Sequence, residues 1–188
     1  MNSPVSDDIY VRWTQFGVFS SHIRYHGTSK REPWSYPAIA SIVKKWWKLR
    51  YALIPYIMEQ SEKATRTGYP VLRALIFHHP EDKLCWHIDD EYYFGDDFLV
   101  APVMNGEGCR DVYLPKGEWV NFFTGECFEG ECWLKKVDVP LEEMPVYVRK
   151  GATIPMYPEE VDCTDEMDLS KSILVKIDDA YRGFWADR

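Results

Sequence analysis

The sequence predicts an α/β unit followed by an all-β domain, and two patterns carry this prediction. Within residues 7–68, apolar residues recur at helical spacing on both sides of one short alternating segment. After Gly68, short apolar or alternating runs are separated by Gly, Pro and Asn, which is typical of an antiparallel β-sandwich. The hydrophobic content of 46% excludes a disordered chain, so the 188 residues are expected to form a folded core.

The first element is expected to be an amphipathic helix that begins at Asp7 and ends near Ser20. Its apolar residues follow helical spacing, and Asp7 and Asp8 lie at its N-terminal end, where the helix dipole favours negative charge. Residues 22–26, which read HIRYH, alternate with the period of a strand. Residues 27–29 are expected to end this strand as a loop.

A long helix is expected from Tyr36 to Gly68. Pro37 suits its first turn, and Gly68 suits the residue at which it ends. Pro55 lies inside this stretch and removes one backbone donor, so the helix should kink there or divide into two segments.

A helix, a lone strand and a long helix precede the β-rich part, and the lone strand has no parallel partner in the chain. This order is that of the last helix–strand–helix unit of a larger (β/α)8 barrel. Active-site residues of such barrels lie at the C-terminal ends of the strands, which is the position of His26. The chain is therefore expected to be the C-terminal part of a longer enzyme.

The strands of the β-rich part are expected within six runs, and a seventh is expected in the tail. The six runs are PVLRALIFHHP, FLVAPV, DVYLP, EWVNFFTG, CWLKKVDVP and MPVYVRKG, and the tail contains ILVKI.

Charge and cysteine content limit the possible partners. The formal net charge is −8, but residues 1–68 hold ten Lys and Arg against five Asp and Glu. These cations lie mostly on one helix that also needs a solvated face, so a nucleic-acid partner is not expected. The five cysteines are scattered without a C-x-x-C pair, which indicates neither a disulfide framework nor a zinc cluster.

The N-terminal residues MNSPVSDDIY do not have the basic and apolar regions of a signal peptide, and no apolar run approaches the length of a membrane span. A cytoplasmic location without membrane contact is therefore expected.

Seven strings resemble, in order and in spacing, the C-terminal half of glycoside hydrolase family 31, the α-glucosidases and α-xylosidases. They are VRWTQFGVFSSHIRYHG, REPW, LRYALIPY, TGYPVLRALIF, DDEYYFGDDFLVAPV, RDVYLPKGEWVNFFTGE and MPVYVRKGATIP. The resemblance covers residues 9–157. It implies that residues 1–68 are the C-terminal end of a catalytic (β/α)8 barrel and that residues 69–157 are a proximal antiparallel β-sandwich. Residues 158–188 match poorly and are interpreted as the start of a distal β domain or as a tail.

The resemblance implies retaining hydrolysis of α-glycosides by two aspartates, one a nucleophile and the other a general acid/base. Both belong to motifs of earlier barrel strands, and no stretch here resembles either motif, so the chain is expected to hold no catalytic residue. The family's histidine after the eighth strand falls on His26. This match implies that His26 binds a sugar hydroxyl, to which a neutral imidazole can donate or from which it can accept.

Three other groups of residues allow both a functional and a structural interpretation. The acidic residues of 89–97 are close in sequence, but this does not place two carboxylates across a glycosidic bond, so structural roles are favoured. His78, His79, Cys85 and His87 have no standard zinc-ligand spacing, so neither a metal nor another cofactor is expected. Trp34 could form a wall of the sugar site or anchor its loop against the long helix, and the anchor is favoured.

Two functions are carried forward. The first is part of a retaining glycosidase of carbohydrate metabolism that cleaves terminal α-glycosidic bonds of an α-glucoside or α-xyloside oligosaccharide. Its expected partner is an upstream barrel half or a second copy of the chain. The alternative is a non-catalytic carbohydrate-binding or interaction module, which requires that the sandwich folds alone.

Overall fold

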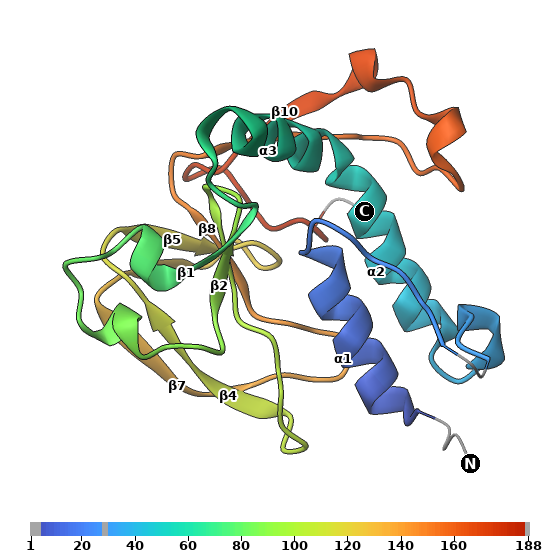
Figure 1. The fold of residues 1–188 in the computed structure, drawn as a ribbon, viewed down its shortest axis with the longest axis horizontal. Coiled ribbons are helices and arrows are strands. Elements are labelled where there is room, and N and C mark those ends of the chain that lie inside the picture. The colour runs from blue at the N-terminus through green and yellow to red at the C-terminus, as the bar shows by residue number, and fades with distance from the viewer. Residues whose placement is uncertain (1–4, 28–29, 187–188) are drawn as a thin grey trace.

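The computed structural model describes residues 5–27 and 30–186, in which a layer of helices lies beside a β-rich part (Figure 1). The three α-helices are α1 (Asp7–Val18), α2 (Ala40–Ala52) and α3 (Ile54–Thr67). None of the helices in these two ranges has both the length and the apolar character that a membrane crossing requires.

The prediction of the first helix is confirmed. Asp7 and Asp8 lie in the first turn of α1, and the helix ends just before Phe19. The guanidinium of Arg50, on α2, donates hydrogen bonds to the carbonyl oxygens of Val18 at 2.8 Å and Ser21 at 3.0 Å, and a third to the carbonyl of Ser20. Because the last carbonyls of a helix have no partner within it, Arg50 satisfies groups that would otherwise need water.

The prediction of a strand at residues 22–26 is wrong. The segment is irregular and pairs with no strand in the part of the chain that the structure describes. A strand exists only when a neighbour takes up its backbone hydrogen bonds, and alternation in sequence cannot supply that neighbour.

The long helix begins later than predicted and divides where predicted. Pro33 opens a 3-10 helix, Pro33–Ser35, and α2 begins only at Ala40, so Pro37 lies in the turn before the helix. Pro55 is the second residue of α3, which separates α3 from α2 at Leu53. Gly68 ends α3 with a φ of 77°, a left-handed conformation that glycine adopts without a steric penalty.

The β-rich part contains a six-stranded antiparallel sheet in the order β1-β2-β3-β8-β5-β6. Its strands are β1 (Leu72–Ala74), β2 (Tyr92–Phe94), β3 (Phe98–Val100), β8 (Val146–Arg149), β5 (Glu118–Asn121) and β6 (Cys127–Glu129). Two antiparallel pairs accompany it: β4 (Cys109–Leu114) with β7 (Cys132–Asp138), and β9 (Thr153–Met156) with β10 (Ile173–Lys176). Each predicted run contains a strand, whereas β2, β6 and β9 were not predicted.

Both faces of the six-stranded sheet are buried, and alternate residues of its central strands point to opposite faces. On β3, Phe98 and Val100 belong to the core shared with the helices, and Leu99 belongs to the core beneath the β4–β7 pair. On β8, Val148 belongs to the core shared with the helices, and Tyr147 belongs to the core beneath the β4–β7 pair. The central sheet is therefore the middle layer between the helices and the β4–β7 pair.

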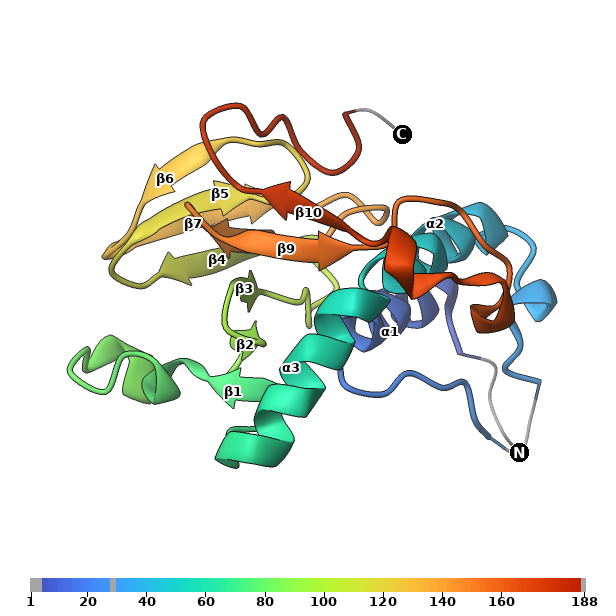
Figure 2. The same ribbon diagram turned by 90° about the horizontal axis from the view of Figure 1, so that it is seen from above.

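Residues 173–185, near the end of the described chain, pack against the β-rich part. Strand β10 lies beside β9 (Figure 2), and the ring of Phe184 stacks on Phe122 with centroids 5.2 Å apart. Residues 173–185 thus share the core of the sandwich, while the assignment of residues 158–188 to a distal domain or tail stays a prediction.

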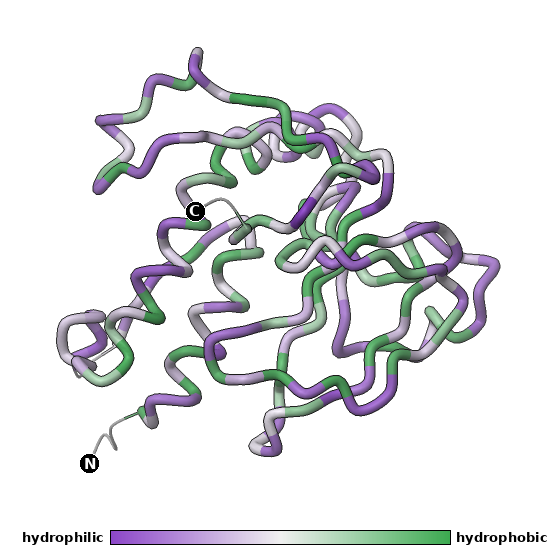
Figure 3. The backbone as a smooth tube through the Cα atoms, turned by 180° about the vertical axis from the view of Figure 1, so that it is seen from behind, coloured by the Kyte–Doolittle hydropathy of each residue, from purple (hydrophilic) through white to green (hydrophobic). Residues whose placement is uncertain are grey.

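The helices and the sheet share one aromatic core centred on Phe98. Its ring centroid lies 5.8 Å from Phe19 at the end of α1, 5.0 Å from Tyr56 on α3 and 5.1 Å from Phe122. Figure 3 shows hydrophobic and hydrophilic positions alternating along the helices, as expected when one face of each helix covers this core. The helices and the helix-facing side of the central sheet therefore form one continuous core.

We expect Phe98→Ala to lower the free energy of unfolding by about 3–5 kcal/mol, because it removes a fully buried ring at the junction of both layers. Urea unfolding followed by far-UV circular dichroism and by tryptophan fluorescence should show the same shifted transition with both probes. Leu174→Ala, at a side chain that is 68% exposed, should change stability by no more than about 0.5 kcal/mol. A helical signal that survives after the fluorescence transition would contradict a shared core.

Candidate functional site

His26 lies on a pocket between α1 and the segment that follows it. The pocket has a volume of about 230 Å³, and aromatic and cationic side chains form most of its lining. The lining residues are Val5, Ile9, Tyr10, Trp13, Arg24, Tyr25, His26 and Arg31. Aromatic faces beside hydrogen-bonding groups form the kind of surface that a sugar ring can occupy.

Tyr25, next to His26, anchors this segment to the helices. Its ring stacks on Tyr10 with centroids 4.9 Å apart. Its hydroxyl lies 2.7 Å from Thr14 Oγ1 and accepts a hydrogen bond from Trp47 Nε1 at 3.1 Å. Because Tyr10 and Thr14 are four residues apart on one face of α1, both can hold the same side chain.

The contact between His26 and Arg24 fixes which imidazole nitrogen carries the proton. Nη2 of Arg24 lies 3.0 Å from Nδ1 of His26. A guanidinium can only donate, so Nδ1 accepts and the proton of the neutral ring resides on Nε2. His26 is exposed, and its Nε2–H is therefore available to donate to a ligand.

The structure brings Arg24 and Arg31 to the pocket but not Trp34. The Glu32 carboxylate accepts from the backbone N–H of Arg31 at 3.1 Å, and the Arg31 guanidinium donates to the Tyr36 hydroxyl at 3.5 Å. Trp34 is 79% exposed, so the favoured anchoring role against the long helix is wrong. The 3-10 helix that contains Trp34 turns this side chain toward solvent.

Three acidic residues of 89–97, Asp90, Glu91 and Asp96, are paired with cations, and none of them lines the pocket of His26. Glu91 is fully buried and accepts from the backbone N–H of Tyr113 at 2.8 Å and from Arg110 at 3.3 Å. Burial raises the pKa of Glu91 to about 7 despite these contacts. Asp90 pairs with the same Arg110 guanidinium at 3.0 Å. These contacts hold Asp90 and Glu91 in the sandwich as structural groups.

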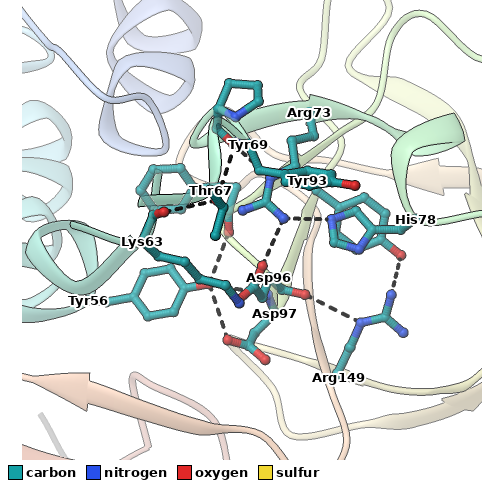
Figure 4. Close-up of polar contacts among 12 residues, drawn as sticks. Tyr56, Lys63, Thr67, Tyr69, Arg73, His78, Tyr93, Asp96, Asp97 and Arg149 are labelled. Carbon is teal, nitrogen blue, oxygen red and sulfur yellow. Dashed lines mark hydrogen bonds and ion pairs between the residues drawn. The ribbon is translucent and has the colours of Figure 1, made fainter. Parts of the chain in front are cut away.

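Asp96 is the centre of a second polar cluster, which joins α3 to the sheet (Figure 4). Its carboxylate accepts from Arg73 at 2.7 Å and from Lys63 of α3. Arg73 also donates to Nε2 of His78 at 3.0 Å. Burial, together with the charge of Arg73, lowers the pKa of His78 to about 4.

Two of the three histidines considered as zinc ligands, His78 and His79, make other contacts. His79 Nε2 lies 2.8 Å from the hydroxyl of Tyr93, and His78 contacts Arg73. Within residues 5–27 and 30–186, no group of three or more His, Cys, Asp or Glu side chains is arranged to hold a metal ion.

Comparison with models of protein families shows to which family this chain belongs. Residues 2–60 match the model of the TIM-barrel domain of glycosyl hydrolases family 31, and residues 68–154 match the model of the glycosyl hydrolase family 31 C-terminal domain. The chain belongs to glycoside hydrolase family 31. It corresponds to a C-terminal portion of that family, and the order of the two matched regions is the one that the sequence predicted.

Relatives from this family are enzymes with different substrates. Alpha-glucosidase 2 of Bacillus thermoamyloliquefaciens is 35% identical over 78% of this chain and 19% of its own length. An alpha-xylosidase of Saccharolobus solfataricus is 35% identical over 85% of this chain and 22% of its own length. Among solved structures, the family 31 dextranase of Flavobacterium johnsoniae in complex with isomaltotriose has a TM-score of 0.76 and 39% identity, covering 84% of this chain and 20% of the enzyme. The chain thus spans about a fifth of the length of these relatives.

The sequence predicted His26 as a sugar-binding residue but did not predict the residues that surround it in the pocket. Arg24 was left out of the expected site, and Tyr10, Trp13 and Tyr25 were assigned only to a helix stripe and a strand. The spacing of Tyr10 and Trp13 on α1 was the available signal, because residues three apart on a helix lie on the same side. The sequence did not show which segment this side of the helix would meet.

We expect the stability of the chain to fall as the pH is lowered from about 6.5 toward 4, in part because of His78. The pKa of His78 is about 4 in the fold, against an ordinary value of 6.5. Between these values the unfolded chain binds more protons than the folded chain, so acid favours unfolding. In His78→Gln the amide oxygen can still accept from Arg73 but does not titrate. Melting temperatures across this range should therefore fall less steeply in the variant.

His87→Gln is the matched control for this measurement, because His87 is exposed. Its pH profile should follow that of the unaltered chain. Parallel profiles for His78→Gln and the unaltered chain would show that His78 does not contribute to acid lability.

Proposed function

We propose that this chain forms the C-terminal end of the catalytic barrel and the adjoining β-sandwich of a retaining glycosidase that cleaves terminal α-glucosides or α-xylosides. Support comes from membership of family 31 and from the names of the relatives, which include an α-glucosidase and an α-xylosidase. The dextranase complex with isomaltotriose supports a carbohydrate ligand.

The observation that carries this proposal is the presentation of His26 on an aromatic pocket. Arg24 occupies Nδ1, so Nε2–H is the group left to bind a sugar oxygen. Tyr10, Trp13 and Tyr25 supply apolar ring surface beside it. Such a site can hold one hydroxyl of a sugar in a fixed direction while the ring carbons pack on the aromatic side chains.

In this function His26 binds and orients the substrate but transfers no proton. Retaining cleavage needs two carboxyl groups about 5–5.5 Å apart, one to attack the anomeric carbon and one to protonate the leaving oxygen. The described carboxylates near the polar clusters are engaged with Arg110, Arg73 and Lys63. We therefore assign both catalytic groups to a barrel portion outside this sequence, and we expect the isolated chain to hydrolyse no aryl α-glycoside.

When the chain is joined to a barrel that carries the two carboxylates, we expect His26→Ala to lower kcat/KM by roughly 5-fold to 150-fold. This range corresponds to about 1–3 kcal/mol, the cost of leaving a buried sugar hydroxyl without its partner. The melting temperature should change little, because His26 is exposed. Steady-state kinetics on an aryl α-glucoside and an aryl α-xyloside, with a thermal melt of each variant, tests this role.

His87→Ala is the control, since His87 is exposed and lies on the sandwich after the 3-10 helix Leu84–Trp86. It should leave kcat/KM near that of the unaltered enzyme. Equal losses of kcat/KM in both variants would show that His26 does not bind the substrate. A His26→Ala effect that appears only as a lower melting temperature would show the same.

A second observation favours a protein partner for the same helix. Ile9 and Trp13 on α1 are 57% and 67% exposed, and Met104 on the facing loop is 67% exposed. Together with neighbouring residues they line a largely apolar groove of about 560 Å³. Large apolar side chains gathered in this way mark interaction surfaces. We propose that the upstream barrel half covers this groove, which would place it directly beside the pocket of His26.

We expect Trp13→Lys to weaken binding of a separately expressed barrel half by about 30-fold or more, because a central tryptophan of an interface typically contributes 2 kcal/mol or more. Trp86→Lys, at a side chain that is 61% exposed on the sandwich, should leave the dissociation constant unchanged. Light scattering of the isolated chain should be run in parallel. Self-association that Trp13→Lys abolishes, without any binding of the barrel half, would instead identify a second copy of the chain as the partner.

A further inference from the structure

Glu91 has a buried carboxyl oxygen without a partner. Glu91 directly precedes β2, and its side chain is fully buried. Its Oε1 accepts from the backbone N–H of Tyr113, on β4, at 2.8 Å and from Nη2 of Arg110, also on β4, at 3.3 Å. Its Oε2 has no hydrogen-bond partner in the part of the chain that the structure describes. An ionised carboxylate carries negative charge on both oxygens, so a buried and unpartnered Oε2 disfavours the ionised form.

Arg110 balances only part of the negative charge beside it. Its Nη2 also lies 3.0 Å from the carboxylate of Asp90. Its Nη1 donates to the carbonyl of Asp90 at 3.0 Å and to that of Pro102, and its Nε donates to the carbonyl of Asp111 at 2.9 Å. Within residues 5–27 and 30–186, Arg110 is the one ion-pair partner of Glu91. A single guanidinium is therefore shared by two carboxyl groups.

The cluster around Asp96 has the opposite balance of charge. There, one carboxylate lies between two cations, 2.7 Å from Arg73 and in contact with Lys63. Two positive charges favour an ionised Asp96, whereas the one positive charge that Glu91 shares with Asp90 leaves an excess of negative charge. A proton on Glu91 restores the balance at the second cluster.

Other titratable groups near Glu91 supply no compensating charge. Cys85, Tyr93 on β2 and Tyr147 on β8 lie within electrostatic reach of its carboxyl group. Burial raises the pKa of Cys85 to about 12 and the pKa values of both tyrosines above their ordinary value, so all three groups are neutral at pH 7. Burial likewise raises the pKa of Glu91 itself to about 7.

We propose that Glu91 is a proton-binding site inside the sandwich, and that loss of its proton weakens the contact between β4 and the segment before β2. The proton resides on Oε2, because Oε1 accepts from two N–H donors. When the proton leaves, a second carboxylate competes with Asp90 for the same guanidinium, and the charge on Oε2 has no partner. This pH-sensitive contact does not depend on whether the parent protein hydrolyses glycosides.

The contribution of Glu91 to stability falls as the pH rises. The pKa of Glu91 is about 7 in the fold, against an ordinary value of 4.5, so between these values the folded chain binds more protons than the unfolded chain. The contribution is therefore complete below pH 4.5 and is lost as the pH rises through about 7. His78 acts in the opposite direction between pH 4 and 6.5, so each variant is compared with the unaltered chain at the same pH.

The direct test is a pH titration of the full chain, labelled with ¹³C and ¹⁵N, by NMR from pH 5.5 to 8.5. The side-chain carboxyl ¹³C signal of Glu91 should move with a midpoint near pH 7. The backbone amide signal of Tyr113 should move with the same midpoint, because this amide donates to the same carboxyl group.

Variants test the effect on stability and its cause. Glu91→Gln keeps the size of the side chain but cannot ionise, so its folding equilibrium constant, relative to that of the unaltered chain, should rise about 10-fold to 30-fold from pH 5.5 to 8.5. Glu129→Gln, at an exposed position on β6, is the matched control, and its ratio should stay constant. Asp90→Asn removes the competing carboxylate, so the NMR midpoint of Glu91 should fall by about 0.5 pH unit or more.

The proposal is overturned if the Glu91 signal stays at its ionised position from pH 5.5 to 8.5, or if Glu91→Gln and the unaltered chain show parallel stability profiles. An unchanged midpoint in Asp90→Asn would also overturn it, because the shared guanidinium would then not explain the bound proton. The NMR titration uses the unaltered chain, so it decides the question even if Glu91→Gln does not fold. None of these outcomes bears on the kinetic role of His26, so this proposal and the proposed function can fail independently.

Discussion

The contact of Phe98 with Phe19, Tyr56 and Phe122 joins the two halves of this chain, and most other features depend on it. Phe98 lies on a central strand of the six-stranded sheet, so its ring projects into the helical layer at the middle of the interface. Phe19 reaches the same point from the end of α1, and Tyr56 reaches it from α3. A helical unit and a sheet that would each expose a large apolar face therefore bury them against one another.

The helix α1, fixed in this way, lines the pocket of His26 and holds the segment before β8. Its N-terminal half lines the pocket of His26 through Tyr10 and Trp13, and Arg12 and Gln15 on the same helix hold the segment that carries Glu142 and Glu143. Arg50 then ties the end of α1 to α2. Because rigid elements hold binding groups more closely than loops do, a well-anchored helix keeps Tyr10 and Trp13 at defined positions in this pocket.

The two polar clusters of the sandwich serve the fold rather than the chemistry of a glycosidase. Asp96 lies between Arg73 and Lys63 and thereby connects α3 to the sheet (Figure 4), and Glu91 binds Arg110 beneath the β4–β7 pair. Both carboxylates are at least half buried, where an ionised group needs a cation or a backbone donor. Within residues 89–97, the carboxylates of Glu91 and Asp96 are thus explained by contacts that stabilise the fold.

The sequence by itself determined the elements that depend on local chemistry. Helical spacing and acidic residues at the N-terminus marked α1, Pro55 separated α2 from α3, and Gly68 ended α3 in the left-handed conformation that favours glycine. Short runs between turn residues located seven strands, and the HIRYHG string indicated His26.

Only the tertiary structure decided the features that depend on a neighbour. Residues 22–26 alternate like a strand, yet they find no strand to pair with and are held by side chains of α1 and α2 instead. The proton position on His26 follows from Arg24, which lies beside it only in the folded chain. Spacing along a chain specifies which face a residue occupies, whereas the partner across that face is set by packing between segments far apart in sequence.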